Sequence, residues 1–299
     1  AVIANAVKLI ADRADEFKFL LKAETGQPQL IIDMMQYGAA VSGLQFYSAA
    51  ADKFTWKDVR DGIYGQTLVL RESIGVVGAV VAWNVPLFLA CNKLGPALLA
   101  GCTMVLKPAA ETPLTINLLA EVFAEAGLPE GVLSVVPGGP ETGQALTASP
   151  LVDKYTFTGS TLVGRAVGVL AAEKLKPCTL ELGGKSPCII DASCDLDSAA
   201  LKIAHGKLLN AGQTCIAPDY VLLPRGSEAA FGEAFARAVA RLFPTIEGNP
   251  DYAAIISPHH HERRRAGRLG VPLPQIPPHH ERHGARCTHH DRRRPPPSC

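Results

Sequence analysis

A cysteine, a glutamate and an asparagine carry the side chains in this sequence that could act on a carbonyl carbon. Cys215 lies in NAGQTCIAPDY among small and polar residues that leave its thiol accessible, and a predicted helix precedes it. Glu181 lies in the run TLELGG, and Asn84 lies in AWNVP. A thiolate can attack a carbonyl carbon, a carboxylate can take a proton from water, and a side-chain amide can donate to an oxyanion. These three residue types together indicate acyl-level chemistry.

Each of these three residues also has a plainer structural interpretation. Most lone cysteines are inert small hydrophobic residues. Glu181 could be an edge-strand carboxylate bound to turn amides, or a general base whose pKa is raised by desolvation. Asn84 could hydrogen-bond to its own turn. The residue types alone therefore leave both interpretations open at each position.

The segment GSTLVG, from Gly159 to Gly164, could hold a phosphate. It joins a predicted strand to a predicted helix, where free N–H groups and the helix dipole favour an anion. Its spacing is neither GxGxxG nor the GK[ST] ending of a P-loop, so a plain tight turn stays open as an alternative. Lys107 ends another predicted strand and precedes Pro108. It could hold ribose hydroxyls or a phosphate, or it could be a solvated surface lysine.

Strands and helices alternate along the central part of the chain and would position these residues. Apolar runs predict strands over residues 75–83, 103–107, 133–138, 154–159 and 178–182. Helices are predicted over 3–24, about 30–52, 86–99, 111–127, from Thr161 onward and over 196–209. This order predicts an α/β fold with a parallel, doubly wound sheet. Ligands bind such sheets outside the carboxyl ends of the strands, where Asn84, Lys107, Gly159, Ser160 and Glu181 all lie.

The composition excludes several other classes of protein. The chain has 299 residues, 47% of them hydrophobic and 19% charged, and a net charge of +1, so we expect a globular protein without a nucleic-acid partner. No apolar run approaches the length of a membrane helix, and the charged N-terminal segment is not typical of a signal peptide. None of the eight cysteines forms a CxxC pair. We therefore expect a cytoplasmic protein with free thiols, no metal and no membrane contact.

Residues 258–299 form a tail of different composition. The tail holds eight of the nine histidines and nine arginines, against three acidic residues. It has no helical or alternating period, which predicts disorder. We expect that the reading frame shifts near residues 257–261 and that out-of-frame sequence and a premature stop follow. The alternatives are a metal-binding histidine tail and a nucleic-acid arm, which the spacing of the residues does not favour.

Five separated motifs occur in one order along the chain: VLRESIGVVGAVVAWNVPLFL, ALLAGCTMVLKPAAETPL, YTFTGSTLVGR, TLELGGKSPCII and GQTCIAPDY. Over about residues 1–257 the chain resembles the aldehyde dehydrogenase superfamily in these motifs. The stretch from Thr179 to Tyr220 is most similar to the class that includes fatty-aldehyde and coniferyl-aldehyde dehydrogenases. The resemblance implies a Rossmann-like variant of the doubly wound sheet, followed by the start of a second α/β catalytic domain.

The resemblance implies a mechanism, the oxidation of an aldehyde to a carboxylic acid with NAD(P)+. Cys215 matches the family nucleophile, whose thiolate attacks the aldehyde to give a thiohemiacetal. The side-chain amide of Asn84 and the backbone N–H of Cys215 would hold the oxyanion. Hydride transfer to the nicotinamide leaves a thioester, and Glu181 matches the base that activates water to hydrolyse it.

The resemblance also implies which residues hold the cofactor. Lys107 matches the ribose-binding lysine, Gly159 and Ser160 match the turn under the pyrophosphate, and Val163 would lie against the adenine. The full implied set is Val81, Trp83, Lys107, Gly159, Ser160, Val163 and Gly183. Many members that prefer NAD carry a glutamate three residues after the lysine, but this chain has Ala110 there. A glutamate there would repel a 2′-phosphate, so its absence leaves NADP open as an alternative to NAD, which is the default expectation.

The resemblance divides the chain into four parts. These are N-terminal helices over 1–52, a dinucleotide-binding domain over 53–182, a partial catalytic domain over 183–257 and the tail over 258–299. Compared with the family, the sequence lacks the usual lead-in, the E-x-F-G-P motif of the second part of the catalytic domain, and the oligomerising arm. We therefore do not expect a family-like homo-oligomer.

Three functions compete on this basis. The first is an NAD(P)-dependent dehydrogenase acting on a small-molecule aldehyde. The second is a truncated, catalytically impaired homologue that at most binds nucleotide, because a divided catalytic domain would expose apolar faces and fix the nicotinamide poorly. The third is a CoA-acylating aldehyde dehydrogenase, which Glu181 disfavours because a hydrolytic base selects water as the acceptor.

Overall fold

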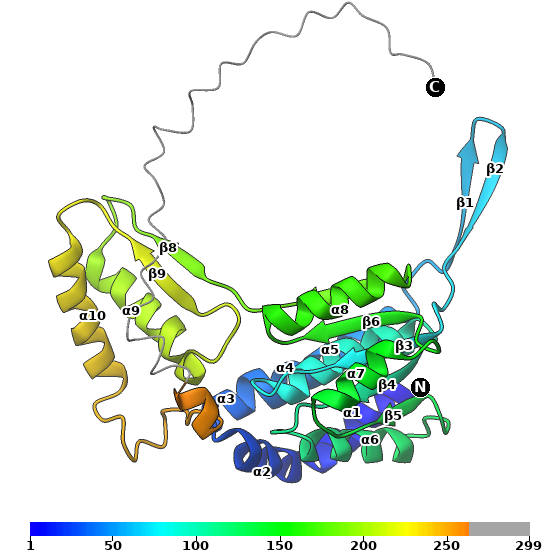
Figure 1. Ribbon diagram of the computed structural model, residues 1–299, viewed down its shortest axis with the longest axis horizontal. Helices are drawn as coiled ribbons and strands as arrows, with labels where there is room; N and C mark the ends of the chain where they lie inside the picture. The colour runs from blue at the N-terminus through cyan, green and yellow to red at the C-terminus, as the bar shows by residue number, and fades with distance from the viewer. Residues whose placement is uncertain (263–299) are drawn as a thin grey trace, which may run out of the picture. The chain divides into compact units, whose positions relative to one another are not determined.

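Five short apolar strands form a parallel sheet in the order β5-β4-β3-β6-β7. Their bounds are β3 (Val76–Val80), β4 (Thr103–Lys107), β5 (Leu133–Val135), β6 (Lys154–Thr158) and β7 (Cys178–Glu181). The computed structural model describes residues 1–262, so the predicted disorder of the tail from residue 263 onward lies outside the described residues (Figure 1). Residues 1–256 form one compact unit, and the description below concerns that unit.

Helices cover both faces of this sheet. Helices α5 (Pro86–Leu99) and α6 (Leu114–Glu125) contact β4 and β5, while α7 (Pro140–Ala148) contacts β3 and β4, and α8 (Thr161–Glu173) contacts β6 and β7. Along β3 the side chains alternate: Val77 and Ala79 belong to the core with α5 and α6, whereas Val76 and Val80 pack with residues of α7 and α8. Burial on both faces is typical of parallel sheets. The predicted α/β fold with a doubly wound sheet is confirmed.

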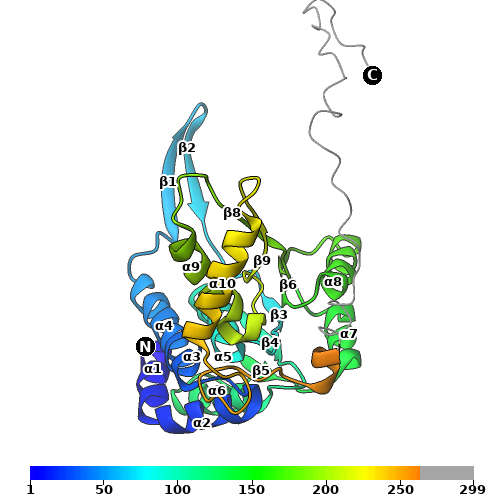
Figure 2. The same cartoon turned by 90° about the vertical axis from the view of Figure 1, so that its left-hand side faces the viewer.

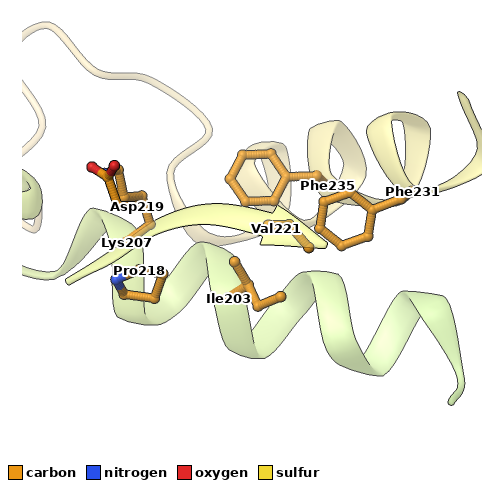
Figure 3. A pocket seen from close by; sticks show the side chains of 7 residues that line it. All are labelled: Ile203, Lys207, Pro218, Asp219, Val221, Phe231 and Phe235. Carbon is orange, nitrogen blue, oxygen red and sulfur yellow. The ribbon is translucent and has the colours of Figure 1, made fainter. Parts of the chain in front are cut away.

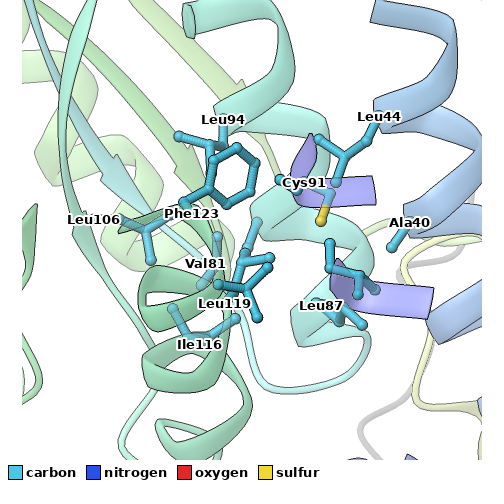
Figure 4. Packing of buried hydrophobic residues seen from close by; sticks show 14 of the residues in the cluster. Ala40, Leu44, Val81, Leu87, Cys91, Leu94, Leu106, Ile116, Leu119 and Phe123 are labelled. Carbon is cyan, nitrogen blue, oxygen red and sulfur yellow. The ribbon is translucent and has the colours of Figure 1, made fainter. Parts of the chain in front are cut away.

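The larger core lies between the sheet and the N-terminal helices. Leu44, Leu87, Leu94, Leu106 and Phe123 meet there from four different elements (Figure 4). The N-terminal helices are α1 (Val2–Asp12), α2 (Ala14–Thr25), α3 (Gln29–Ile31), the π-helix Ile32–Gly38 and α4 (Ala39–Ala50). These helices contribute side chains to the same core, so the residues predicted as N-terminal helices pack on the central sheet.

The structure differs from the predicted helices in two details. The single helix expected over 3–24 is wrong, because it breaks at Arg13, whose φ of −106° and ψ of 24° end α1 and begin α2. The buried stripe of Ala6, Ile10, Phe17 and Leu21 continues across the break, so its periodicity does not reveal it. The second predicted helix, about 30–52, contains a π-helical segment in its middle.

Two small sheets accompany the central one. Strands β1 (Lys57–Gly62) and β2 (Gly65–Leu70) form an antiparallel hairpin, and β8 (Ser186–Ile189) pairs in parallel with β9 (Pro218–Leu222). Helices α9 (Leu196–Leu208) and α10 (Glu228–Leu242) lie side by side next to β9 (Figure 2). Predicted strand 75–83 is shorter than expected, since β3 ends at Val80 and the segment with Asn84 leaves the sheet.

Candidate active site

Cys215 follows a strained loop and is exposed. After α9 the chain passes through Asn210 and Ala211, both with φ of 50°, and Gly212, with φ of 73°. Non-glycine residues in this left-handed region cost about 1–3 kcal/mol each. The side-chain amide of Gln213 bridges the loop by donating to the carbonyls of Asn210 at 3.1 Å and Ala254 at 2.9 Å. Surrounding hydrogen bonds therefore hold the conformation that presents Cys215.

Asn84 lies beside the cysteine loop, although the two are far apart in sequence. Its side-chain Nδ2 donates to the carbonyl of Gln213 at 2.9 Å. The Asn84 backbone carbonyl in turn accepts from the side chain of Asn210 at 3.3 Å. A primary amide carries two N–H donors, and Gln213 takes one of them. The alternative in which Asn84 only bonds to its own turn is wrong, because its partners lie in the segment before Cys215.

Glu181 lies at the end of β7, where the sequence predicts it, but it is exposed. Glu181 therefore lacks the desolvation on which its interpretation as a general base rested. The neighbouring backbone is ordered by the N–H of Gly159, which donates to the Glu181 carbonyl at 3.0 Å. The structure thus places the two residues at adjacent strand ends.

Lys93 is a residue of this region that the sequence-based prediction missed. It lies on α5, and its Nζ donates to the Oγ1 of Thr156 at 3.0 Å. Burial lowers the pKa of Lys93 to about 8, and the negative charge of Glu181 opposes this shift. The available signal was that Lys93 is the single charged residue in the helical run PLFLACNKLGPALL.

Lys107 is buried at the end of β4, with only 6% of its surface exposed. Its Nζ donates to the carbonyl of Pro108 at 2.9 Å. Burial lowers the pKa of Lys107, while Glu111 and Glu141 act in the opposite direction. The interpretation as a solvated surface lysine is therefore wrong. Burying an ammonium costs free energy unless the charge is paired or hydrogen-bonded.

The turn predicted to hold a phosphate leads directly into α8. Ser160 is the N-cap of this helix, and its Oγ accepts from the backbone N–H of Val163 at 3.3 Å. Thr161, Leu162 and Val163 in the first turn are exposed. The helix N-terminus is thus open to a ligand that carries negative charge.

The three other predicted cofactor residues lie in different environments. The side chain of Val81 is 1% exposed and packs in the core with Leu119 and Ile116 (Figure 4). Its side chain therefore faces away from a surface ligand, which differs from the expectation that it lines the slot. Trp83 is half-buried, and Gly183 is exposed.

A separate apolar pocket lies between α9, β9 and α10 (Figure 3). Its walls include Ile203, Val221, Phe231 and Phe235, with Lys207 and Asp219 at one end. None of the predicted site residues lines it. Among residues 1–262 there is no group of three or more His, Cys, Asp or Glu side chains that could hold a metal ion. Within the same part of the chain, every helix is too short or too polar to cross a membrane.

Comparisons with known proteins give one consistent result. The model of the aldehyde dehydrogenase family matches residues 1–268, which extends past the resemblance seen in the motifs. Geranial dehydrogenase of Castellaniella defragrans is 38% identical over 82% of this chain and 51% of its own length. A probable coniferyl aldehyde dehydrogenase of Caulobacter vibrioides is 44% identical over 68% of this chain and 41% of its own length. The chain therefore spans about half the length of the curated relatives it matches.

Solved structures agree with these matches. An aldehyde dehydrogenase of Mycobacterium tuberculosis complexed with NAD+ is 55% identical, with a TM-score of 0.83 over 89% of this chain and 55% of the other. An NAD+ complex of an aldehyde dehydrogenase from Bacillus cereus is 33% identical, with a TM-score of 0.81 over 88% of this chain and 54% of the other. An NADP-dependent enzyme of E. coli is 35% identical, with a TM-score of 0.76 over 81% of this chain and 50% of the other.

Proposed function

The chain belongs to the aldehyde dehydrogenase family, and on that premise we propose that its site oxidises an aldehyde to a carboxylic acid with NAD+. The observation that supports this most strongly is the hydrogen bond from the Asn84 amide to the Gln213 carbonyl, at 2.9 Å. This bond brings the Asn84 amide, which is far away in the sequence, to the segment that contains the exposed Cys215. Nucleophile and oxyanion donor are thus adjacent, as attack on a carbonyl requires.

In the first step of the proposed reaction, the thiolate of Cys215 attacks the aldehyde carbon. The carbonyl π-bond breaks as the sulfur–carbon bond forms, and the negative charge moves to the oxygen. The second N–H of Asn84 and the backbone N–H of Cys215 hold this oxyanion. The exposure of Cys215 supports the step, because the thiol must be reached by the aldehyde.

The residues at the strand ends fit a dinucleotide. A bound NAD+ would supply the acceptor for the hydride that leaves the thiohemiacetal carbon. Lys107 would hold ribose hydroxyls with its buried ammonium, and Gly159 and Ser160 would lie under the pyrophosphate at the open N-terminus of α8. Val163, Trp83 and Gly183 complete the proposed contacts, together with the backbone of Val81, whose side chain lies in the core.

The cofactor is proposed as NAD+, with NADP+ as the alternative. Relatives from M. tuberculosis and B. cereus were crystallised with NAD+. Ala110 leaves no carboxylate three residues after Lys107, and a carboxylate there would repel a 2′-phosphate. Comparing initial rates with NAD+ and NADP+ separates the two.

Glu181 is the proposed base of the second step. It takes a proton from water, the hydroxide attacks the thioester carbon, and the carbon–sulfur bond breaks to release the acid and the Cys215 thiolate. Lys93 lies close enough to Glu181 for the two charges to interact.

We propose the same division of the chain as its sequence suggests. Residues 1–52 and 53–182 form the helices and the dinucleotide-binding domain, and residues 183–257 form part of a catalytic domain.

A specific observation favours the second candidate function, an impaired homologue that binds nucleotide only. Strands β8 and β9 form a parallel sheet of only two strands within residues 1–262, whereas parallel sheets are normally larger and covered on both faces.

Two measurements on the purified full chain distinguish these functions. The first is NADH formation from hexanal and NAD+, which we expect Cys215→Ser to abolish. Cys194→Ser is the matched control, because Cys194 is also exposed and lies outside the proposed site. The second is quenching of Trp83 fluorescence by NAD+ in a Trp56→Phe background. Turnover that survives Cys215→Ser contradicts the proposed mechanism, and quenching without turnover favours the impaired homologue.

A further inference from the structure

A chain of buried side-chain amides leads from the π-helix to Asn84. Gln36 in the π-helix is 0% exposed, and its Nε2 donates to the Oε1 of Gln27 at 2.8 Å. Gln27 is 2% exposed, and its Nε2 donates to the backbone carbonyl of Asn84 at 2.8 Å. The chain thus ends on the residue whose side chain is the proposed oxyanion donor.

The direction of donation along this chain is fixed at its end. A backbone carbonyl can only accept, so Gln27 must turn its NH2 group toward Asn84 and its oxygen toward Gln36. Gln36 must then present its own NH2 group to Gln27. Reversing either amide would set two oxygens against each other. The orientation of both glutamine amides therefore follows from the backbone carbonyl of Asn84, which can only accept a hydrogen bond.

Packing alone does not explain this arrangement. The Oε1 of Gln36 is buried without a hydrogen-bond partner among the described residues. A buried polar group left unpaired costs about 1–3 kcal/mol. Gln36 also lies in a π-helical turn, and such turns are frequent at functional sites.

The amide chain holds the backbone carbonyl of Asn84, and the loop before Cys215 holds both this carbonyl and the side-chain amide. The carbonyl of Asn84 accepts from Gln27 and Asn210, and its side-chain amide donates to Gln213. Asn210 itself has the left-handed φ of 50°. Both groups of Asn84 are thereby fixed, which leaves one orientation for its remaining N–H.

We propose that Gln27 and Gln36 are positioning residues that set the direction of the Asn84 amide toward the oxyanion. The inference rests on the proposed function of Asn84 and Cys215. Gln27 acts directly on the Asn84 backbone, and Gln36 acts through Gln27. Neither residue touches the substrate. Loss of either should weaken the stabilisation of the thiohemiacetal oxyanion while the Cys215 thiol stays accessible.

Protection of Cys215 by an aldehyde tests this without requiring turnover. The full chain is incubated with increasing hexanal, without cofactor, and then with iodoacetamide, and alkylation of Cys215 is followed by peptide mass spectrometry. Thiohemiacetal formation removes the free thiol and slows alkylation. The hexanal concentration that halves the alkylation rate reports how well the site stabilises the adduct.

Methionine substitutions remove the amide donors at nearly constant volume. For Gln27→Met we expect the half-protecting hexanal concentration to rise about fivefold, as the loss of one hydrogen bond would give. Gln36→Met should raise it less, because Gln36 acts through Gln27. This second variant removes the unpaired Oε1 of Gln36 and leaves the Oε1 of Gln27 without its donor, so the number of unpaired buried oxygens stays the same and the variant should fold. Gln29→Met is the matched control, because Gln29 is exposed and bonds to Asp33 on the surface. The alkylation rate without aldehyde should stay unchanged in all three.

The outcomes separate the two levels of the proposal. If hexanal protects Cys215 equally well in the parent chain, Gln27→Met and Gln36→Met, the positioning role is overturned, even if both variants have lower melting temperatures. Absence of any protection in the parent chain overturns the proposed function of Cys215 and the inference with it. A rise confined to Gln27→Met and Gln36→Met supports the inference.

Discussion

The cysteines of this chain differ in the environment of their thiols. Cys91 lies in the main core, and burial raises the pKa of its thiol to about 12. Cys215 is exposed beside polar groups of the loop. Since the thiolate is the reactive form, a buried protonated thiol and an exposed one should differ widely in rate.

We therefore predict selective alkylation in the native protein. At pH 8, iodoacetamide should modify Cys215 and the exposed Cys194 at least about tenfold faster than Cys91, given the dependence of reactivity on the thiolate. Peptide mass spectrometry over time measures the three rates. In 8 M urea the three should react at similar rates, which serves as the control. Equal rates in the native protein would contradict the burial of Cys91.

The half-buried Lys93 predicts a dependence of stability on pH. Burial lowers the pKa of Lys93 to about 8 in the folded protein, whereas an unfolded lysine has a pKa of about 10.4. Between these values the unfolded chain binds a proton that the folded chain has lost. The contribution of Lys93 therefore becomes less destabilising as the pH rises through this window.

Lys93→Met should remove that rise. The free energy of unfolding of the variant, relative to the parent, should be most favourable at pH 7 and should fall as the pH approaches 10. Urea denaturation at pH 7, 8.5 and 10 measures the difference. Lys8→Met, at an exposed position, should show no such trend. A constant difference between Lys93→Met and parent would mean that the pKa of Lys93 is not shifted.

At the scale of elements, the N-terminus of α6 depends on a residue from another helix. Its own N-cap, Pro113, provides no side-chain hydrogen bond. The carboxylate of Glu24 accepts instead from the backbone N–H groups of Leu114 and Thr115. The Thr115 hydroxyl donates to the same carboxylate. Glu24 thereby joins the end of α2 to the start of α6.

Glu24→Ala should lower the free energy of unfolding by about 1–2 kcal/mol, the usual cost of losing a helix cap. Thermal or urea unfolding followed by circular dichroism measures the loss. Glu125→Ala is the matched control, since Glu125 is exposed in the last turn of the same helix and should change stability little. A loss of the same size in both variants would argue against the capping role.

The strands of the central sheet were predictable because each is a short apolar run with polar or glycine neighbours. TMVLK became β4 with the predicted bounds, and CTLEL became β7 with one residue less. The positions of Lys107 and Glu181 at strand ends followed from this. The hairpin β1–β2 was not predictable, since both of its strands are largely exposed and KDVRDG has no apolar alternation.

Contacts that depend on tertiary packing could not be predicted. The π-helix at Ile32–Gly38 lies within an uninterrupted helical pattern. Burial of Lys93 depends on how α5 lies against β6, and exposure of Glu181 depends on which residues face the end of β7. The amide chain from Gln36 to Asn84 joins segments whose spacing in sequence carries no signal. The sequence therefore predicts which strand ends carry polar residues, and the fold decides how those residues interact.

At the scale of the molecule, the described chain contains cores of very different size. The main core joins the N-terminal helices to the sheet, whereas the cluster around α9 and α10 contains only three buried residues within the described part of the chain, Ala200, Phe231 and Ala234. The pair β8–β9 exposes Ile189 at 77% and Leu222 at 51%. Small cores and exposed apolar strands have low local stability.

Native-state hydrogen exchange should reveal this difference. The amides of β4, an interior strand of the sheet, should exchange only on global unfolding, while those of β9 should exchange at least about tenfold faster, a gap of ~1.4 kcal/mol in opening free energy. Mass spectrometry of exchanged peptides at pH 7 measures both, and the exposed hairpin β1–β2 gives the fast reference. If β9 were as well protected as β4, residues 1–256 would unfold as one cooperative unit. The loop that contains Cys215, which lies between α9 and β9, would then be as stable as the central sheet, and the case for an impaired homologue would lose its physical basis.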